Sequence, residues 1–235
     1  MVSLARNRIL EALPELERAA LWAVAREKKI PSGTEILAAN SPFSHVYFPE
    51  TAVFSLVTDL VEGNSVESGT VGFEGFVGLP VFFGGESSPQ RTIVQIPGVA
   101  CVLTADAFRK IVGSLPSLDA LLKRYALAFI AQISQTAACN SQHSILQRCA
   151  RWILLTHDRV GSNDILLTQE FLAYMLGVRR PSVTVAEADL KSRELIGYSR
   201  GRMQVLDRAG LEAISCECHG AVRREFEKLT GAAVG

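Results

Sequence analysis

The sequence predicts an α+β protein with an antiparallel β-sandwich or barrel in its N-terminal half, then one long helix, then a winged helix-turn-helix. Short runs rich in Val, Ile, Phe and Thr alternate with turn signals between residues 28 and 103. A stretch without glycine or proline follows Pro116. Two short helical patterns then meet at Gly177 and precede a hairpin pattern. We expect three segments: 1–115, 116–142 and 143–235.

The composition is that of a globular protein with a sizeable core. Of 235 residues, 48% are hydrophobic and 20% charged, and the net charge is zero. No apolar run reaches the roughly 20 residues that a membrane span needs, and the N-terminus lacks the pattern of a secretory signal. The five cysteines are an odd number without disulfide-framework spacing, which favours a reducing cytoplasm as the location.

The N-terminal half predicts short strands at "HVYFP", "AVFSLVTDL", "RTIVQI" and "ACVLT". Turns are expected at Pro31-Ser32-Gly33, Glu62-Gly63-Asn64, Gly84-Gly85 and Pro97-Gly98. Helices are expected on both sides of these strands. Pro14 suits the first position of one helix, and Thr104 is placed to cap another that ends near Gly113.

The helix expected after Pro116 carries apolar residues at intervals of three and four over more than three heptads. Such a stripe is typical of a seam between two helices, so we expect a homodimer. The alternative is a core helix inside one chain. The residues expected at the dimer interface are Leu118, Leu122, Tyr125, Phe129, Gln132 and Thr136.

Residues 167–190 predict two short helices joined by a tight turn. Thr168 is placed to cap the first helix, and Gly177 suits a turn with positive φ at its end. Pro181 suits the first position of the second helix, whose buried side would hold Val183, Ala186 and Leu190. This is the arrangement of a helix-turn-helix, in which the second helix enters the major groove of DNA.

A hairpin follows at "LIGYSRGRMQVLD", with arginines at its tip, and suggests a wing that contacts the sugar-phosphate backbone. Arginine can bind guanine or phosphate, and hydroxyl and amide groups can serve either surface. The alternative is a pair of ordinary solvated turns on a helical domain. The residues expected to contact DNA are Thr168, Gln169, Arg179, Arg180, Ser182, Thr184, Arg200 and Arg202.

The run from Leu167 to Leu211 resembles the winged helix of the Crp/Fnr superfamily of bacterial transcription regulators. "VYFPETAVFSLV", "GTVGFEGFVGLPVFFGG" and "RTIVQIPGVA" resemble the β-roll sensor domain of that superfamily. The resemblance implies a jelly-roll-like, cyclic-nucleotide-binding-like β-roll and a dimerisation helix. It also implies a homodimer on double-stranded DNA with a near-palindromic operator, and RNA polymerase as a further partner.

The same resemblance places an effector site at Gly75, Phe76, Arg91 and Thr92. The cyclic-nucleotide branch has a Gly-Glu pair that holds the ribose and an Arg-Ser or Arg-Thr pair that holds the phosphate. Arg91-Thr92 keeps the second pair, but Phe76 replaces the acidic residue. A cyclic nucleotide, another small ligand and an effector-independent regulator are therefore all open. A further alternative is a cyclic-nucleotide-type sensor whose helical domain binds a protein.

The sequence predicts no certain cofactor and no metal site. No cysteine precedes Cys101, which argues against the N-terminal iron–sulfur cluster of the redox-sensing branch. Cys216, Cys218 and His219 offer three ligands where a closed zinc site wants four, and on a helix the two cysteines would point apart. Cys139 and Cys149 are expected to pack as small hydrophobic residues.

Enzyme motifs are missing: there is no Gly-x-Ser-x-Gly elbow and no phosphate-binding Gly-Lys-Ser loop. The expected recognition helix also departs from the cyclic-AMP branch, which reads its half-site with an Arg-Glu pair and a second Arg. Arg180, Pro181 and Val185 stand at those places. The resemblance therefore implies DNA binding at an operator unlike that of the cyclic-AMP branch.

Overall fold

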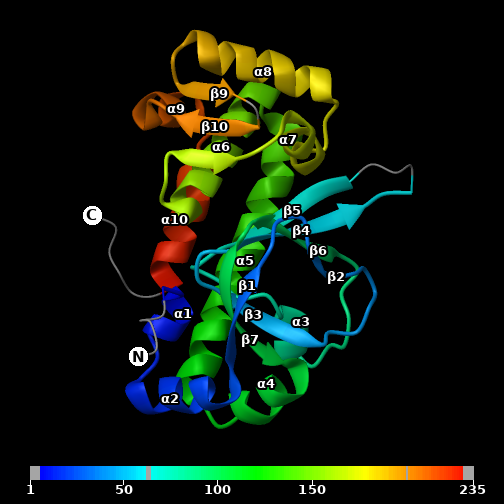
Figure 1. The fold of residues 1–235 in the computed structure, drawn as a ribbon, viewed down its shortest axis with the longest axis vertical. Helices are drawn as coiled ribbons and strands as arrows, with labels where there is room; N and C mark the ends of the chain where they lie inside the picture. Colours follow the sequence, from blue (N-terminus) through cyan, green and yellow to red (C-terminus); the bar gives the residue numbers. More distant parts are fainter. Residues whose placement is uncertain (1–5, 62–64, 200, 230–235) are drawn as a thin grey trace. The chain divides into compact units, whose positions relative to one another are not determined.

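The structure is a computed structural model that describes residues 6–61, 65–199 and 201–229 (Figure 1). The chain divides into two compact units. Unit 1 comprises Met1–Leu56, Gly69–Ala131 and Arg224–Gly235, and unit 2 comprises Val57–Ser68 and Gln132–Arg223. Each unit takes in residues that are distant in the sequence.

The N-terminal half contains short strands flanked by helices, as expected. The elements are α1 (Arg8–Glu11), α2 (Glu15–Val24), β1 (Arg26–Ile30), β2 (Glu35–Leu37), β3 (His45–Pro49), β4 (Val53–Asp59), β5 (Ser65–Val71), α3 (Leu79–Phe82), β6 (Arg91–Ile96), β7 (Gly98–Thr104) and α4 (Ala105–Val112). The strands β1, β2 and β5 and the helix α3 were not predicted. Thr104 caps α4 through its side chain, as predicted. Pro14 is the N-cap of α2 rather than its first residue. The turn expected at residues 62–64 lies outside the described residues.

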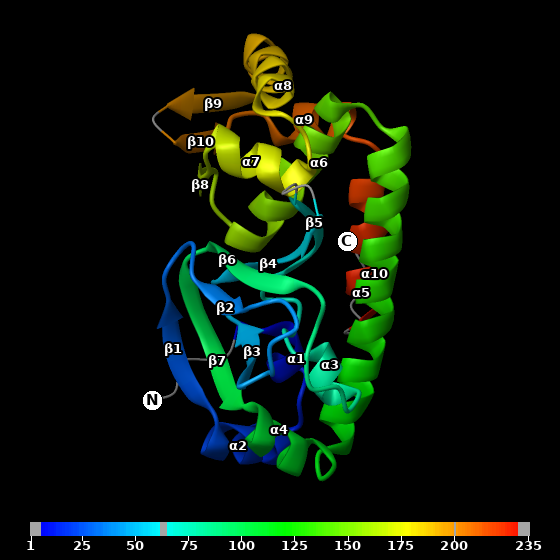
Figure 2. The same ribbon diagram turned by 90° about the vertical axis from the view of Figure 1, so that its right-hand side faces the viewer.

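The strands form one sheet in the order β1-β7-β3 and another in the order β2-β6-β4-β5. Strand β7 pairs antiparallel with both β1 and β3, and β2 pairs antiparallel with β6. Figure 2 shows β1, β7 and β3 running side by side. The predicted antiparallel β-roll is therefore confirmed.

Aromatic side chains fill the interior of unit 1. Phe48, Phe54, Phe76 and Phe108 are buried, and the ring centroids of Phe76 and Phe108 lie 5.1 Å apart. Phe76 therefore belongs to the core. Its burial stabilises the roll by about 2–3 kcal/mol.

The long helix α5 runs from Pro116 to Gln142, as predicted (Figure 2). The carboxylate of Glu17 accepts hydrogen bonds from the backbone N–H groups of Ser117 and Leu118, which would otherwise lack partners in the first turn. The stripe expected at a dimer interface is buried within the chain: Leu118, Leu122, Tyr125, Phe129, Gln132 and Thr136 are at most 9% exposed. These side chains are buried against other parts of the same chain, so their assignment to a dimer interface is corrected.

The remaining elements are α6 (Ile145–Val160), β8 (Asp164–Leu166), α7 (Gln169–Leu176), α8 (Arg180–Ser192), β9 (Ile196–Ser199), β10 (Arg202–Val205), α9 (Arg208–Ile214) and α10 (Cys218–Leu229). Ser144 and Gln147 form a capping box at the start of α6, and Gly161 ends that helix in the left-handed conformation. The expected wing is the β9–β10 hairpin, and β8 pairs with the other edge of β10. No helix in the described ranges is long and apolar enough to cross a membrane.

Candidate DNA interface and sensor cavity

The helix-turn-helix is built from α7, the turn at Gly177 and α8. The side chain of Thr168 accepts the N–H of Phe171 and so caps α7. Gly177 ends α7 with φ 62° and ψ 39°, a conformation that costs glycine least. Val183, Ala186 and Leu190 are buried, as predicted. The sequence therefore predicted the caps and the buried face of this unit correctly.

Helix α8 begins at Arg180, with Arg179 as its N-cap, so Pro181 is its second residue rather than its first. One side of α8 is exposed at positions spaced by three and four residues: Pro181, Thr184, Val185 and Ala188. Val185 is 72% exposed. An exposed row on the second helix is the surface that meets base edges in this motif.

Polar side chains link the first turns of the two helices. Arg180 Nη1 lies 2.7 Å from Glu170 Oε1. The hydroxyl of Thr184 donates to Gln169 Oε1 over 3.3 Å, and Gln169 Nε2 donates to Glu187 Oε2 over 2.5 Å. Three of the residues expected to contact DNA, Gln169, Arg180 and Thr184, therefore belong to the polar contacts between these two helices.

Two buried hydrogen bonds are donated by side chains of α6, and one of them reaches the helix-turn-helix. A guanidinium N–H of Arg148 in α6 donates to the carbonyl of Leu176, at the end of α7. Trp152 Nε1 donates to Glu67 Oε1 over 3.0 Å. Both bonds are buried, so each partner would lose a hydrogen bond without regaining water if the other were removed.

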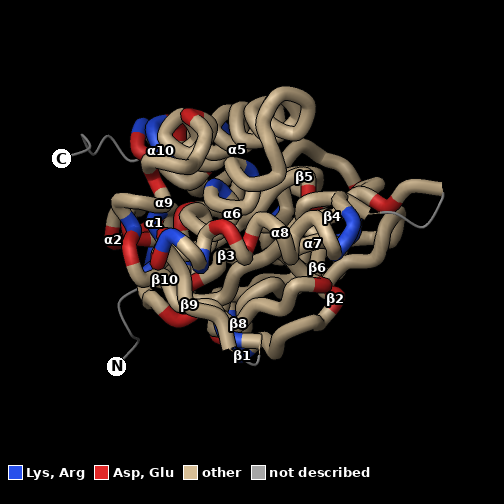
Figure 3. Tube along the Cα trace, turned by 90° about the horizontal axis from the view of Figure 1, so that it is seen from above, with Lys and Arg blue, Asp and Glu red and all other residues tan. Residues whose placement is uncertain are grey.

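The wing places Arg202 opposite Ser199, directly beside the hairpin tip. Arg202 is exposed, whereas Arg200 lies outside the described residues. In Figure 3 acidic and basic positions are interspersed instead of forming one basic face. Phosphate binding at this surface would therefore rest on individual arginines.

The residues expected to bind an effector do not come together in one polar site. Thr92 and Phe76 line a cavity of about 230 Å³ in unit 1, and no described residue lining it is charged. Arg91 pairs with Glu35, with 3.6 Å between Nη1 and Oε2. A Cβ at Gly75 would lie 2.8 Å from the ring of Tyr125, so this glycine serves close packing.

The acidic residue beside Gly75 does not replace the missing ribose ligand. Glu74 is buried, and its Oε1 accepts a hydrogen bond from the backbone N–H of Gly72 within the same loop. The cavity contributes hydroxyl and amide groups from Ser88, Gln90 and Thr92 on an otherwise apolar wall. Such a wall suits a small, uncharged and largely apolar molecule.

Comparison with known proteins agrees with this geometry. Residues 147–214 match the family model of the Crp-like helix-turn-helix domain. No curated protein has a sequence that matches the chain. Among solved structures, FixK2 from Bradyrhizobium japonicum has a TM-score of 0.70 at 16% identity, over 82% of this chain and 98% of FixK2.

Two further structures have the same fold. A putative Crp/Fnr-family transcriptional regulator from Eubacterium rectale has a TM-score of 0.67 at 15% identity, over 86% of this chain and 94% of its own. A CRP-family transcriptional regulator from Thermus thermophilus has a TM-score of 0.67 at 19% identity, over 80% of this chain and 96% of its own. Residues 147–214 thus form a Crp-like helix-turn-helix domain, a DNA-binding module, and the chain shares the fold of these Crp/Fnr-type regulators.

Proposed function

We propose that the protein binds a near-palindromic DNA operator as a homodimer, with α8 of each copy in the major groove. The observation that carries this proposal is the exposed row of side chains on α8. This helix follows α7, which Thr168 caps and Gly177 ends. A two-fold dimer matches two half-sites about one helical turn apart, roughly 34–36 Å. A regulator bound beside a promoter has RNA polymerase as its natural partner.

The polar residues fall into two groups: some would bind phosphate and position the protein, and others would contact base edges and read the sequence. Arg179, at the N-cap of α8, and Arg202, beside the wing tip, are exposed and suited to phosphate. Thr168 and Gln169 lie at the N-terminus of α7, where the helix dipole also favours a phosphate. Arg180, Ser182 and Thr184 lie in the first turns of α8, where side chains reach base edges. Arg200 is assigned to the wing from the sequence alone.

The exposed side chains in the middle of α8 are apolar. Val185 and Ala188 are exposed on the same side of α8 as Thr184. An aliphatic side chain in the major groove contacts the methyl group of thymine, which no other base presents. We therefore expect a half-site with a thymine at the position that faces Val185.

Dimerisation is assigned to the exposed side of α5, since the buried stripe is occupied. Leu127 and Ile130 are 68% and 58% exposed, and Ser134, Ala137 and Ser141 continue the same side at spacings of three and four. Small residues in such a row allow two helices to approach closely, and large apolar ones provide burial. An interface centred on Leu127 and Ile130 thus replaces the one predicted from the sequence.

The sensor cavity favours an uncharged ligand or none over a cyclic nucleotide. A cyclic phosphate needs a cation or several N–H donors, and the cavity wall has no charged residue within the described part of the chain. Calorimetric titration with cyclic AMP and cyclic GMP should give no heat. A stoichiometric binding isotherm that Arg91→Ala abolishes would restore the cyclic-nucleotide assignment.

The DNA-binding role is tested by fluorescence anisotropy with promoter-length duplexes over a salt series. Phosphate contacts release counterions, so the logarithm of the binding constant should fall linearly with the logarithm of the salt concentration. An affinity that does not depend on salt, or binding only to a protein partner, would contradict the proposal and favour a protein-docking helical domain.

A further inference from the structure

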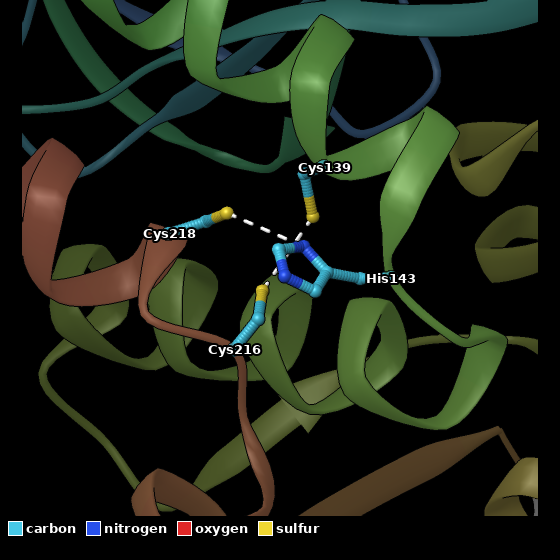
Figure 4. Close-up of side chains that lie close together, drawn as sticks. All are labelled: Cys139, His143, Cys216 and Cys218. Atoms are coloured by element: carbon cyan, nitrogen blue, oxygen red, sulfur yellow. Dashed lines mark hydrogen bonds between the residues drawn. The ribbon is translucent and has the colours of Figure 1, made fainter.

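Four side chains with metal-binding atoms meet in unit 2. The sulfur atoms of Cys139, Cys216 and Cys218 and a ring nitrogen of His143 all lie within 4.8 Å of one another. Figure 4 shows the three thiols directed toward the imidazole. The cysteines are at most 4% exposed, and the His143 side chain is 17% exposed. The cluster is therefore closed to bulk water on most sides.

Two separate parts of the chain supply the ligands. Cys139 and His143 are four residues apart, and the N–H of His143 donates to the carbonyl of Cys139, so both face one side at the end of α5. Cys216 follows α9, and Cys218 is the first residue of α10. Because Cys216 precedes the helix, the expectation that the two cysteines point apart on one helix is wrong.

The neighbouring histidine is not part of the cluster. His219 Nε2 lies 2.8 Å from Asp158 Oδ2, so its ring is held by a hydrogen bond to α6. The "CECHG" segment thus contributes two ligands, and the two that the sequence did not reveal are Cys139 on α5 and His143 directly after that helix.

The distances suit a tetrahedral ion. Zinc binds thiolate sulfur at about 2.3 Å and histidine nitrogen at about 2.0–2.1 Å, so neighbouring ligand atoms of a tetrahedron lie roughly 3.5–3.8 Å apart. Cys139 Sγ and Cys216 Sγ are 3.5 Å apart, and Cys218 Sγ and His143 Nδ1 are also 3.5 Å apart. Small side-chain adjustments would bring all four atoms to one ion.

We propose that Cys139, His143, Cys216 and Cys218 bind one zinc ion as a closed Cys₃His site. Four protein ligands leave no open position for a water or a substrate, so the site is structural. It would join the C-terminal end of α5 to the segment between α9 and α10. Binding requires the thiolate forms, so the three thiols release their protons as the ion enters.

Groups around the cluster support ligation. His143 Nε2 lies 3.3 Å from a carboxylate oxygen of Glu217, the outer partner that orients a ligating imidazole. Gln135 Nε2 donates to Cys218 Sγ over 3.0 Å, which would stabilise a thiolate. These contacts give the cluster an outer shell of hydrogen-bonding groups.

The test uses the full-length protein, purified under a thiol reductant and incubated with zinc sulfate. After gel filtration, elemental analysis should find one zinc per chain. Cobalt(II) in place of zinc should give the intense visible absorption of a tetrahedral thiolate site. Cys216→Ser and Cys218→Ser should each lose stoichiometric zinc. The matched control Cys101→Ser, a buried thiol on β7 in unit 1, should keep it.

A substitution at an exposed position keeps the proposal testable even if the cysteine variants fail to fold. Glu217 is 76% exposed, so Glu217→Gln should fold normally and weaken zinc affinity about 10- to 100-fold, as loss of an outer-shell partner does. His219→Gln should leave the affinity unchanged. The proposal is overturned if wild-type protein retains no more zinc than Cys216→Ser. It is also overturned if protein kept under reductant contains a Cys139–Cys216 disulfide in place of the metal.

Discussion

Arg180 and Glu170 connect the two helices of the helix-turn-helix through an ion pair, with 2.7 Å between Nη1 and Oε1. The two side chains are 60% and 62% exposed, so the pair contributes at most about 1 kcal/mol. If Arg180 contacts DNA as proposed, the DNA would displace the carboxylate at little cost. In the free protein the pair holds Arg180 at the start of the recognition helix.

Arg180→Ala should weaken operator binding by about 1–3 kcal/mol and relax the sequence preference at one position if Arg180 reads guanine. If it binds phosphate instead, affinity should fall for all sequences and the salt slope should decrease by about 1. Anisotropy titrations on matched and mismatched duplexes distinguish the two. Arg193→Ala is the control, because Arg193 pairs with Asp189 at the far end of α8. Equal loss in both variants would refute the assigned role.

Val185→Ala should keep the fold, since Val185 is exposed and alanine is a better helix former. It should reduce discrimination at one thymine position by about 1 kcal/mol, near the low end for a single base pair, and leave the salt dependence unchanged. Binding measured against duplexes with thymine replaced by uracil checks this directly. Wild-type protein that does not distinguish thymine from uracil would exclude a methyl contact.

Leu127→Asp combined with Ile130→Asp should convert a dimer to a monomer, because two charges would be placed in the centre of the interface. Light scattering coupled to gel filtration gives the mass. Leu16→Asp is the control: Leu16 is 86% exposed on α2, away from the proposed interface. A variant that stays dimeric would place the interface elsewhere.

Gly177→Ala should destabilise the protein by about 1–2 kcal/mol, the cost of a left-handed conformation for a residue with a side chain. The new Cβ would also lie 3.1 Å from Val66 Cγ2. Gly113→Ala should be neutral or stabilising, because Gly113 has φ −67° and nothing lies within 4 Å of its added Cβ. Urea unfolding of both variants provides the comparison, and equal stability would contradict the strain assigned to Gly177.

Asp158→Asn should change the response to acid. Burial alone would raise the pKa of Asp158, but hydrogen bonds from His219 and Arg208 outweigh it and hold the pKa below the ordinary 3.8. This stabilisation is present above the ordinary value and is lost as the pH falls through the lower, folded-state value. The variant should therefore be less stable at neutral pH by about 1–3 kcal/mol.

The difference between wild type and Asp158→Asn should shrink as the pH falls below about 4. Urea unfolding at a series of pH values measures it, with Asp164→Asn as the exposed control. A difference that is independent of pH would show that the charge of Asp158 is not responsible.

Local signals in the sequence were sufficient to predict the helix-turn-helix. Thr168, Gly177 and the spacing of Val183, Ala186 and Leu190 depend on neighbours within one or two turns, and each was found where expected. The β-roll was predicted for a similar reason, because turn residues punctuate each strand. Strand β8 was missed, since its edge pairing with β10 has no local signature.

Long-range contacts escaped prediction. The periodicity of α5 showed which residues are buried, but not that Tyr125 and Phe129 face their own chain, where Tyr125 also contacts Phe226. Cys139 and Cys216 are separated by 77 residues, so only the folded chain reveals that they meet. A pattern within one helix identifies the buried side and leaves the partner undetermined.

Selection of bound sequences from a random DNA pool by the full-length protein is the most decisive experiment for DNA recognition through α8. We expect two inverted half-sites about one helical turn apart, roughly 10 base pairs centre to centre, each with a thymine opposite Val185. Enrichment of an asymmetric single site, or no enrichment over the starting pool, would contradict a dimer that reads DNA through α8.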